Sequence, residues 1–295
     1  MRVAIITGAS SGLGKEYVKE VSRKEKGIYE MRAIARRKER LLALRELSRI
    51  PVRALPYDLV EMGSIDALAK LLEEEKPDIR LLINAAGFGK IGGSLDIGVE
   101  DTNRMIELNC RAAVDMTYIC IPYMSEGSRI MEICSTAGFQ PFQYLNVYAA
   151  SKAFLYRFTR ALRVELFSKK IKVTAVCPYW IRDTEFIPVA ENAGAVNVGK
   201  PGTESTGGGS AGAEKVTAVR AGKTSVEKAS ADAGKKIKHY PLSSRVHSVA
   251  VSSLAVSRLG LPVSTPGIVC TIHWIVAKVI PSELMMGIWA ILRRV

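Results

Sequence analysis

We expect the chain to fold as an α/β protein with a doubly wound parallel sheet and helices on both faces. Short apolar strands alternate with helical segments as far as about residue 177, which is the order that builds such a sheet. A glycine-rich turn also follows the first strand, as in folds that hold a phosphate at the start of the next helix. The chain has 295 residues and 48% hydrophobic content, which is enough to form the core of a single large domain covering 1–295.

The first strand and the turn after it form the most informative local pattern. Residues 1–6 are a short apolar run, and a helical segment extends from 15 to about 22, with glycines between them spaced Gly-x-x-x-Gly-x-Gly. Glycine lets the backbone turn sharply and approach an anion, and a helix N-terminus attracts phosphate. The turn predicts a pyrophosphate site, with a plain strand-to-helix turn as the alternative. The predicted contacts are Gly8, Ser10, Ser11, Gly12, Leu13 and Gly14.

The end of the second strand, 32–35, indicates which dinucleotide the site prefers. Sites for NAD usually carry a carboxylate here, which binds the ribose 2′-hydroxyl. In this chain Ala35 holds that position, and Arg36 and Arg37 follow. A guanidinium binds a 2′-phosphate through charge-assisted hydrogen bonds. The sequence therefore favours NADPH/NADP over NADH/NAD, with Arg36 as the main contact and Arg37 helping, although a basic helix start exposed to solvent would look the same.

A serine, a tyrosine and a lysine follow in an order that suits proton transfer to a carbonyl oxygen. Ser135 lies thirteen residues before Tyr148, and Lys152 lies four residues after it. Hydride arriving at a carbonyl carbon leaves negative charge on the oxygen, which then needs a proton donor. A free tyrosine titrates near ~10, and a lysine on the same helix face is expected to lower that pKa. A serine hydroxyl donates and accepts, so Ser135 can hold the reacting oxygen.

These motifs together resemble the short-chain dehydrogenase/reductase family, whose members have a single Rossmann-type domain. The similarity is strong over roughly 1–190 and weak beyond it, and it includes the segment 84–87 and the pair Cys177-Pro178. The resemblance implies that Asn109 kinks the fourth helix and joins Ser135, Tyr148 and Lys152 in catalysis. It also implies cofactor contacts from Asp58, Leu59, Asn84, Ala85, Ala86, Gly87, Pro178, Ile181 and Thr184, besides Tyr148 and Lys152.

Two segments depart from the family pattern. After the sixth strand, 172–177, Tyr179 stands where the family has a glycine, and the spacing to Thr184 is altered. Residues 191–236 are rich in Gly, Ser, Ala, Thr and Lys and lie where the family has a substrate-binding lid. Such a composition buries little apolar surface, so we expect a flexible insert with at most a weak helix at 213–231.

Aromatic residues follow several of the motif positions, in loops at the carboxyl ends of strands, where open α/β sheets bind ligands. Their surface favours a bulky apolar ketone or alcohol, such as a steroid, a terpenoid or an aryl ketone. The alternative is that several of these aromatic residues belong to the hydrophobic core and do not contact substrate. The predicted substrate contacts are Phe88, Phe139, Phe142, Tyr144, Tyr179, Trp180 and Phe186.

The C-terminal segment 267–295 is predicted to form two apolar helices separated by Pro281. Each helix is too short to span a bilayer. We expect the pair to close over the substrate pocket or to join a neighbouring subunit of a homo-oligomer, either a dimer or a tetramer. A helix pair that makes weak contact with a membrane surface is the alternative, because the hydrophobic face needed for either role looks alike in sequence.

Composition argues against several other classes of protein. Five scattered cysteines and three histidines without ligand spacing predict neither a disulfide framework nor a metal site. The net charge of +13 is not arranged as a stripe with interleaved aromatics, so no nucleic-acid partner is expected. The first strand begins at Arg2, where no signal peptide fits before it, and we expect a cytoplasmic protein.

The sequence thus predicts an enzyme that reduces a ketone to a secondary alcohol with NADPH, reversibly, with Tyr148 as general acid and base. An NAD-dependent alcohol dehydrogenase is one alternative. A non-catalytic nucleotide-sensing protein of the same fold is another, but it would be expected to carry a damaged Ser135, Tyr148 or Lys152, and all three are present.

Overall fold

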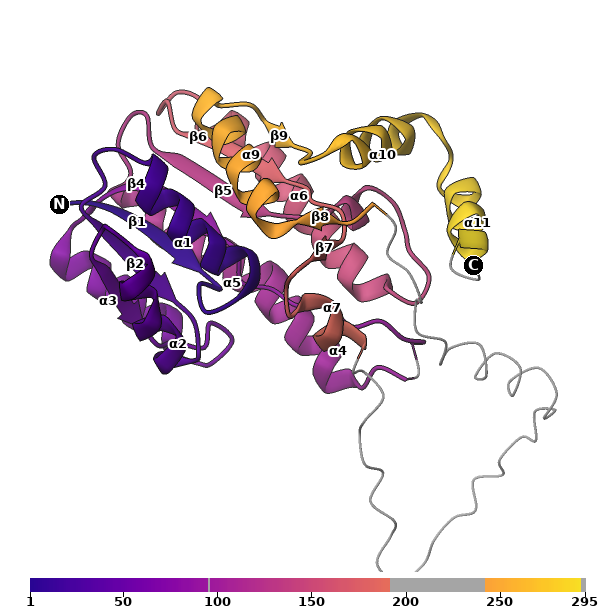
Figure 1. Cartoon of the computed structure of the whole chain (residues 1–295), viewed down its shortest axis with the longest axis horizontal. Coiled ribbons are helices and arrows are strands. Elements are labelled where there is room, and N and C mark those ends of the chain that lie inside the picture. Colours follow the sequence, from indigo (N-terminus) through magenta and orange to yellow (C-terminus); the bar gives the residue numbers. More distant parts are fainter. Residues whose placement is uncertain (95, 192–241, 293–295) are drawn as a thin grey trace, which may run out of the picture.

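The computed structural model describes residues 1–94, 96–191 and 242–292, so most of the expected insert 191–236, with its weak helix, lies outside the described residues. A seven-stranded sheet has the order β3-β2-β1-β4-β5-β6-β9 (Figure 1). Its strands are β1 (Arg2–Thr7), β2 (Glu30–Ile34), β3 (Val52–Leu55), β4 (Asp78–Asn84), β5 (Arg129–Ile133), β6 (Lys172–Val176) and β9 (Val263–Ser264), and the short strands β7 (Ile181–Arg182) and β8 (Ser244–Arg245) form a separate pair.

Helices surround this sheet and connect its strands. The longer ones are α1 (Gly12–Lys24), α3 (Ser64–Glu75), α4 (Val99–Ile106), α5 (Ala112–Cys120), α6 (Asn146–Glu165), α9 (Val246–Leu259), α10 (Ile268–Val279) and α11 (Ser282–Leu292). Shorter ones are α2 (Lys38–Leu42), α7 (Phe186–Glu191), the 3₁₀ turns η1 (Ala43–Leu47), η3 (Ile121–Tyr123) and η4 (Thr136–Phe139), and the π-helical turn η2 (Glu107–Arg111).

Every strand pair in the large sheet is parallel, which confirms the predicted fold class. Successive residues of β1 point to opposite faces, as the period of a strand requires. Ala4 and Ile6 pack with α1 and α9 on one face, whereas Val3 and Ile5 pack with α3, α5 and α6 on the other. The strand order reverses between β1 and β4, and open α/β sheets bind ligands at such a switch point.

The second strand ends earlier than the sequence predicted. β2 ends at Ile34, whereas a strand to 35 was expected, and β3 ends at Leu55. Ala35 and Tyr57 instead line a cavity at the carboxyl edge of the sheet. Ala35 and Tyr57 thus extend the apolar sequence beyond each strand because their side chains face the cavity rather than solvent.

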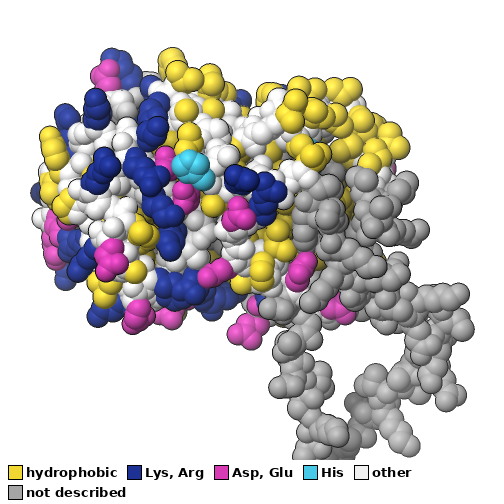
Figure 2. Space-filling model, in the orientation of Figure 1, with side chains coloured by type: hydrophobic (Ala, Val, Ile, Leu, Met, Phe, Trp, Pro, Cys, Tyr) yellow, Lys and Arg dark blue, Asp and Glu magenta, His cyan; other side chains and the backbone are white. Residues whose placement is uncertain are grey.

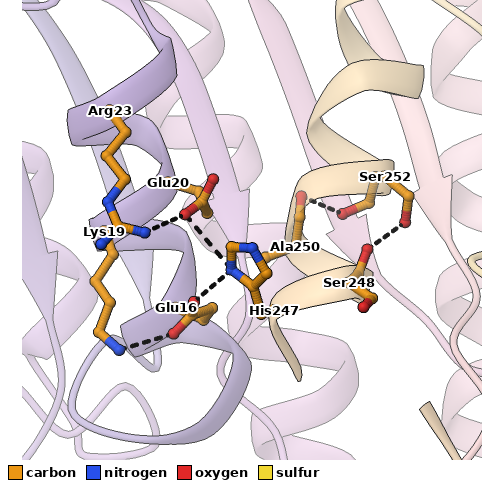
Figure 3. Close-up of polar contacts among 9 residues, drawn as sticks. Glu16, Lys19, Glu20, Arg23, His247, Ser248, Ala250 and Ser252 are labelled. Atoms are coloured by element: carbon orange, nitrogen blue, oxygen red, sulfur yellow. Dashed lines mark hydrogen bonds and ion pairs between the residues drawn. The ribbon is translucent and has the colours of Figure 1, made fainter. Parts of the chain in front are cut away.

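Polar contacts fasten α9 to α1 across the surface of the sheet (Figure 3). His247 Nδ1 lies 3.0 Å from Glu16 Oε1 and 3.6 Å from Glu20 Oε1. Among the described residues, these three side chains form the one group whose ligand atoms are close enough to hold a metal ion. Glu16 already pairs with Lys19, and Glu20 with Arg23, each at 2.9 Å. The cluster is therefore described best as an ion-pair network between two helices, which the sequence did not indicate.

Candidate active site

A cavity of about 320 Å³ opens at the carboxyl ends of β1, β4, β5 and β6. It brings together the glycine turn after β1, the segment after β4, Ser135 after β5 and Pro178 after β6. All the catalytic, cofactor and substrate residues predicted from the sequence line this cavity except Asn84, Asn109, Phe139 and Tyr144. Residues separated by more than a hundred positions in the sequence therefore share one site.

Glycine is required in the turn after β1 because other backbone segments lie too close there to leave room for a side chain. Gly8 and Gly12 have φ values of +65° and +50°, in the left-handed region. A Cβ on Gly8 would lie 2.7 Å from the Ala85 carbonyl oxygen, and a Cβ on Gly14 would overlap the Gly8 carbonyl. The missing side chains leave a concave backbone surface where α1 begins. The first turn of α1 has no acidic residue, so the helix N-terminus keeps its attraction for an anion.

Basic side chains lie next to the glycine turn. Arg37 donates to the hydroxyls of Ser10 and Ser11, at 3.3 and 2.9 Å. Arg36 is more exposed, and its guanidinium lies 3.8 Å from an Asp58 carboxylate oxygen. Of the two arginines expected to hold a 2′-phosphate, Arg37 thus makes the direct contact with the turn.

Glu185 is a cavity residue that the sequence did not single out. Its carboxylate accepts from Arg40 at 2.6 Å and from Arg37 at 3.1 Å. These hydrogen bonds hold the pKa of Glu185 below its usual value. The contact links the loop after β7 to the basic segment after β2, and the acidic residue directly after Thr184 was the signal available for it.

Ser135, Tyr148 and Lys152 all line the cavity. Tyr148 and Lys152 lie on the inner face of α6, with the lysine Nζ 5.8 Å from the tyrosine ring centroid. Lys152 Nζ donates to the Ile133 carbonyl at 2.7 Å, at the end of β5. The Ser135 hydroxyl accepts from the Ala137 backbone N–H at 3.1 Å, which fixes the start of η4.

The protonation of this group differs from what the sequence indicated. Lys152 was expected to lower the pKa of Tyr148, but burial raises that pKa to about 12, and the hydrogen bond with Ser135 only partly opposes the rise. Burial also lowers the pKa of Lys152. Desolvation dominates because Tyr148 packs against Phe186, with ring centroids 5.4 Å apart. The phenol is therefore protonated at neutral pH and can act as a proton donor.

Asn109 lies beside the cavity and connects the segment after β4 to helix α6. It sits in η2, where α4 passes into α5 through a π-helical turn. Its amide exchanges two hydrogen bonds with the Phe88 backbone, at 3.1 and 2.9 Å, and donates to Ser151 Oγ at 3.0 Å. A Cβ on Gly87 would lie 2.9 Å from Asn109 Oδ1 and 3.3 Å from Lys152 Nζ. The bare glycine thus leaves room for both polar groups.

Asn84 faces the protein interior instead of the cavity. Its amide nitrogen donates to Glu132 Oε1 at 2.8 Å and to Thr117 Oγ1 at 2.9 Å. Glu132 is fully buried on β5, and its Oε2 has no hydrogen-bond partner in the part of the chain that the structure describes. Burial raises the pKa of Glu132 to about 7, although the hydrogen bonds from Asn84 and Thr117 act against this rise.

Aromatic side chains form the other end of the cavity. Phe88, Trp180 and Phe186 pack with Phe142 and Tyr148 in one apolar cluster, which also includes Trp289 of α11. Trp289 contacts Phe142 with ring centroids 5.1 Å apart, and Tyr179 also lines the cavity. Of the two predicted aromatics outside the lining, Phe139 packs on Tyr156 and His273, and Tyr144 offers its carbonyl to the Gly92 N–H at 2.9 Å.

Comparison with known proteins assigns the larger part of the chain to a family. Residues 2–192 match the family model described as short chain dehydrogenase. The NADP-dependent 3-hydroxy acid dehydrogenase YdfG of Salmonella typhi is 33% identical over 190 residues, which are 63% of this chain and 75% of that protein.

Solved structures give the same result. The closed form of a serine dehydrogenase complexed with NADP⁺ is 31% identical, with a TM-score of 0.57, and the alignment covers 64% of this chain and 76% of that one. A short-chain dehydrogenase from Sphingobium yanoikuyae in complex with NADPH aligns over 98% of this chain and 96% of that one. Its TM-score is 0.70 at 24% identity, so this likeness concerns the fold alone.

Replacing the buried carboxyl is expected to change how stability depends on pH. The pKa of Glu132 is raised from 4.5 to about 7 on folding, so its contribution to stability is present below pH 4.5 and lost as the pH rises through 7. Glu132→Gln should therefore be more stable than the unmodified protein at pH 8, by up to about 3 kcal/mol, with the difference shrinking toward pH 5. Urea denaturation at the two pH values measures this difference.

The matched control is Glu126→Gln, the same chemical change at an exposed ion pair with Lys170. It should alter stability little at either pH, because exposed pairs contribute about 0–1 kcal/mol. A Glu132→Gln protein that is less stable than the unmodified chain at pH 8 would show that the ionised carboxylate is favourable in the core.

Proposed function

Because the chain belongs to the short-chain dehydrogenase family, we propose that it reduces a bulky apolar ketone to a secondary alcohol with NADPH, reversibly. The observation that carries this proposal is the shared cavity of Ser135, Tyr148, Lys152 and the glycine turn. A dinucleotide held at the turn and a carbonyl held beside the tyrosine would meet in this one space.

The residues present fit a dinucleotide with a 2′-phosphate. The turn from Gly8 to Gly14 would hold the pyrophosphate at the start of α1, where a Cβ would fill the cradle. Arg37, with Arg36 beside it, would pair with the 2′-phosphate, and Ala35 leaves the end of β2 without a carboxylate to repel it. When bound, NADPH supplies the hydride. The NADP⁺ complex of the similar serine dehydrogenase and the similar NADP-dependent 3-hydroxy acid dehydrogenase support this choice.

The protein would handle the proton that accompanies the hydride. The Ser135 hydroxyl would hold the carbonyl oxygen, and the Tyr148 phenol would donate its proton to that oxygen. The raised pKa of Tyr148 keeps the donor protonated through the neutral range. Lys152, fixed by Ile133 and by the gap at Gly87, would hold positive charge next to the tyrosine as its negative charge develops.

The aromatic end of the cavity supports an apolar substrate. Phe88, Phe142 and Trp180 offer ring surface, and the charged lining residues other than Lys152 lie at the cofactor end, on or next to the segments after β2, β3 and β7. A carboxylate substrate, as taken by the similar 3-hydroxy acid dehydrogenase, would find no cation at the aromatic end of the described lining. Steroid and aryl ketones match this surface better.

Removing the phenol hydroxyl should remove the chemistry while leaving the cofactor bound. Tyr148→Phe is expected to lower kcat with NADPH and an aryl ketone by at least about a hundredfold, the scale of general acid catalysis. Stopped-flow and steady-state assays measure kcat, and cofactor fluorescence measures NADPH binding. Tyr156→Phe is the control, because Tyr156 lies on the same helix but contacts Trp274 instead of the reaction site. Near-normal turnover in Tyr148→Phe would contradict the mechanism.

Cofactor choice should depend on the arginine that contacts the turn. Arg37→Ala is expected to weaken NADPH binding by roughly tenfold to a hundredfold, since a charge-assisted pair is lost, and to change NADH binding little. Arg36→Ala, which the sequence alone ranked first, should have the smaller effect. Arg45→Ala serves as a control, because Arg45 only reaches the Val52 carbonyl. Titration calorimetry with both cofactors decides, and equal weakening of NADPH and NADH by Arg37→Ala would exclude a 2′-phosphate contact.

A further inference from the structure

The last two helices present an apolar face to the outside of the protein. On α10, Ile268, Ile272, Ile275 and Val279 are exposed and recur every three or four residues, which places them on one side of the helix. On α11, Leu284 and Ile288 are exposed with the same spacing. These six residues, each between 41% and 79% exposed, are called here the outer face. Figure 2 shows hydrophobic side chains gathered where Figure 1 places α10 and α11.

The opposite sides of the same helices are fixed on the body of the protein. Cys270 is buried, and Trp274 donates from its indole nitrogen to the Tyr156 hydroxyl at 3.2 Å. His273 and Trp289 both pack against Phe142 in the aromatic wall of the cavity. The helices therefore have a defined orientation, and the outer face is the side that this packing leaves uncovered among the described residues.

The composition of the outer face favours lipid over a protein partner. All six side chains are aliphatic, whereas the centres of protein interfaces are enriched in aromatic residues and arginine. Lys278 is exposed beside this face, and its Nζ lies 3.4 Å from the centroid of the Trp274 ring, which is on the side that packs on the body. A long basic side chain at the border of an aliphatic face suits the headgroup region of a bilayer, because its ammonium can reach the anionic groups there.

Length and charge favour a helix pair that lies flat on an anionic membrane. α10 has 12 residues, so it is roughly 18 Å long, and no described helix is long and apolar enough to cross a bilayer. Within 267–295 the charged residues are Lys278, Glu283, Arg293 and Arg294, a basic excess that matches the net charge of +13 of the whole chain. Basic residues next to an apolar face are attracted to anionic headgroups.

We propose that the outer face rests in the headgroup region of an anionic phospholipid bilayer, with α10 and α11 between the membrane and the aromatic wall of the cavity. The bilayer would cover the aliphatic side chains, while the inner sides of the same helices keep their contacts with Phe142 and Tyr156. One consequence rests on the proposed function: an apolar ketone dissolved in the membrane would be concentrated next to the aromatic end of the cavity.

Vesicle sedimentation with the full chain tests this proposal. We expect the protein to sediment with vesicles of phosphatidylcholine mixed with phosphatidylglycerol at low salt, less with phosphatidylcholine alone, and less at high salt. The double variant Ile272→Glu/Val279→Glu adds two negative charges to the outer face and should lower binding by about tenfold or more. The control Met62→Glu/Val99→Glu makes the same charge change at exposed apolar positions at the starts of α3 and α4, and should still bind.

The possible outcomes separate the proposal from its alternatives. Sedimentation that both double variants lose equally, or that the unmodified chain never shows, overturns it. Light scattering without vesicles provides a further test: dissociation of an oligomer by Ile272→Glu/Val279→Glu would mean that a second copy of the chain covers the outer face. Turnover of an aryl ketone with NADPH, without vesicles, is measured in parallel, and both double variants should keep it. Absence of that turnover in the unmodified chain would refute the proposed function while leaving the vesicle result intact.

Discussion

The arrangement of the cavity depends on one buried charge, the ammonium of Lys152. Its side chain is only 5% exposed, and burying an ammonium is costly unless hydrogen bonds and nearby charges compensate for the lost water. The Ile133 carbonyl accepts one hydrogen bond from it, Gly87 leaves space for it, and the Tyr148 ring lies alongside. Through these contacts the lysine of α6 fixes the position of that helix relative to the end of β5 and the segment after β4. Those three segments carry most of the groups proposed to act on the carbonyl, so a shift in the lysine would disturb them all together.

The sequence predicted the features that lie within a few residues of one another. A strand, a glycine turn and a helix start are encoded within the first fifteen residues, and the spacing of Tyr148 and Lys152 places them on one helix face. Contacts between distant segments could not be derived in this way. Glu185 and Arg37 are 148 positions apart, and His247 and Glu16 are 231 positions apart. The direction of the Tyr148 pKa was also missed, because burial depends on how Phe186 and the surrounding core pack around the ring.

The C-terminal helices show why an apolar run in a sequence permits two interpretations. Closure over the pocket and contact with a membrane appeared as alternatives, because both need a hydrophobic helix. In the structure the two sides of α10 and α11 differ: aromatic residues and His273 face the cavity wall, whereas aliphatic residues face outward. One helix pair can therefore serve both roles, and the two proposals support each other, since an apolar substrate concentrates in the lipid that the outer face would contact.

The central claim is that a hydride passes from NADPH to a carbonyl carbon held beside Tyr148. Isotope transfer measures this step most directly, using NADPH deuterated on one face of nicotinamide C4, a bulky aryl ketone and mass spectrometry of the alcohol. The account predicts that the deuterium appears on the carbinol carbon when one face is labelled and not when the other is, while the hydroxyl proton comes from solvent. Alcohol without deuterium from either labelled face, or oxidation of NADPH without formation of alcohol, would contradict it.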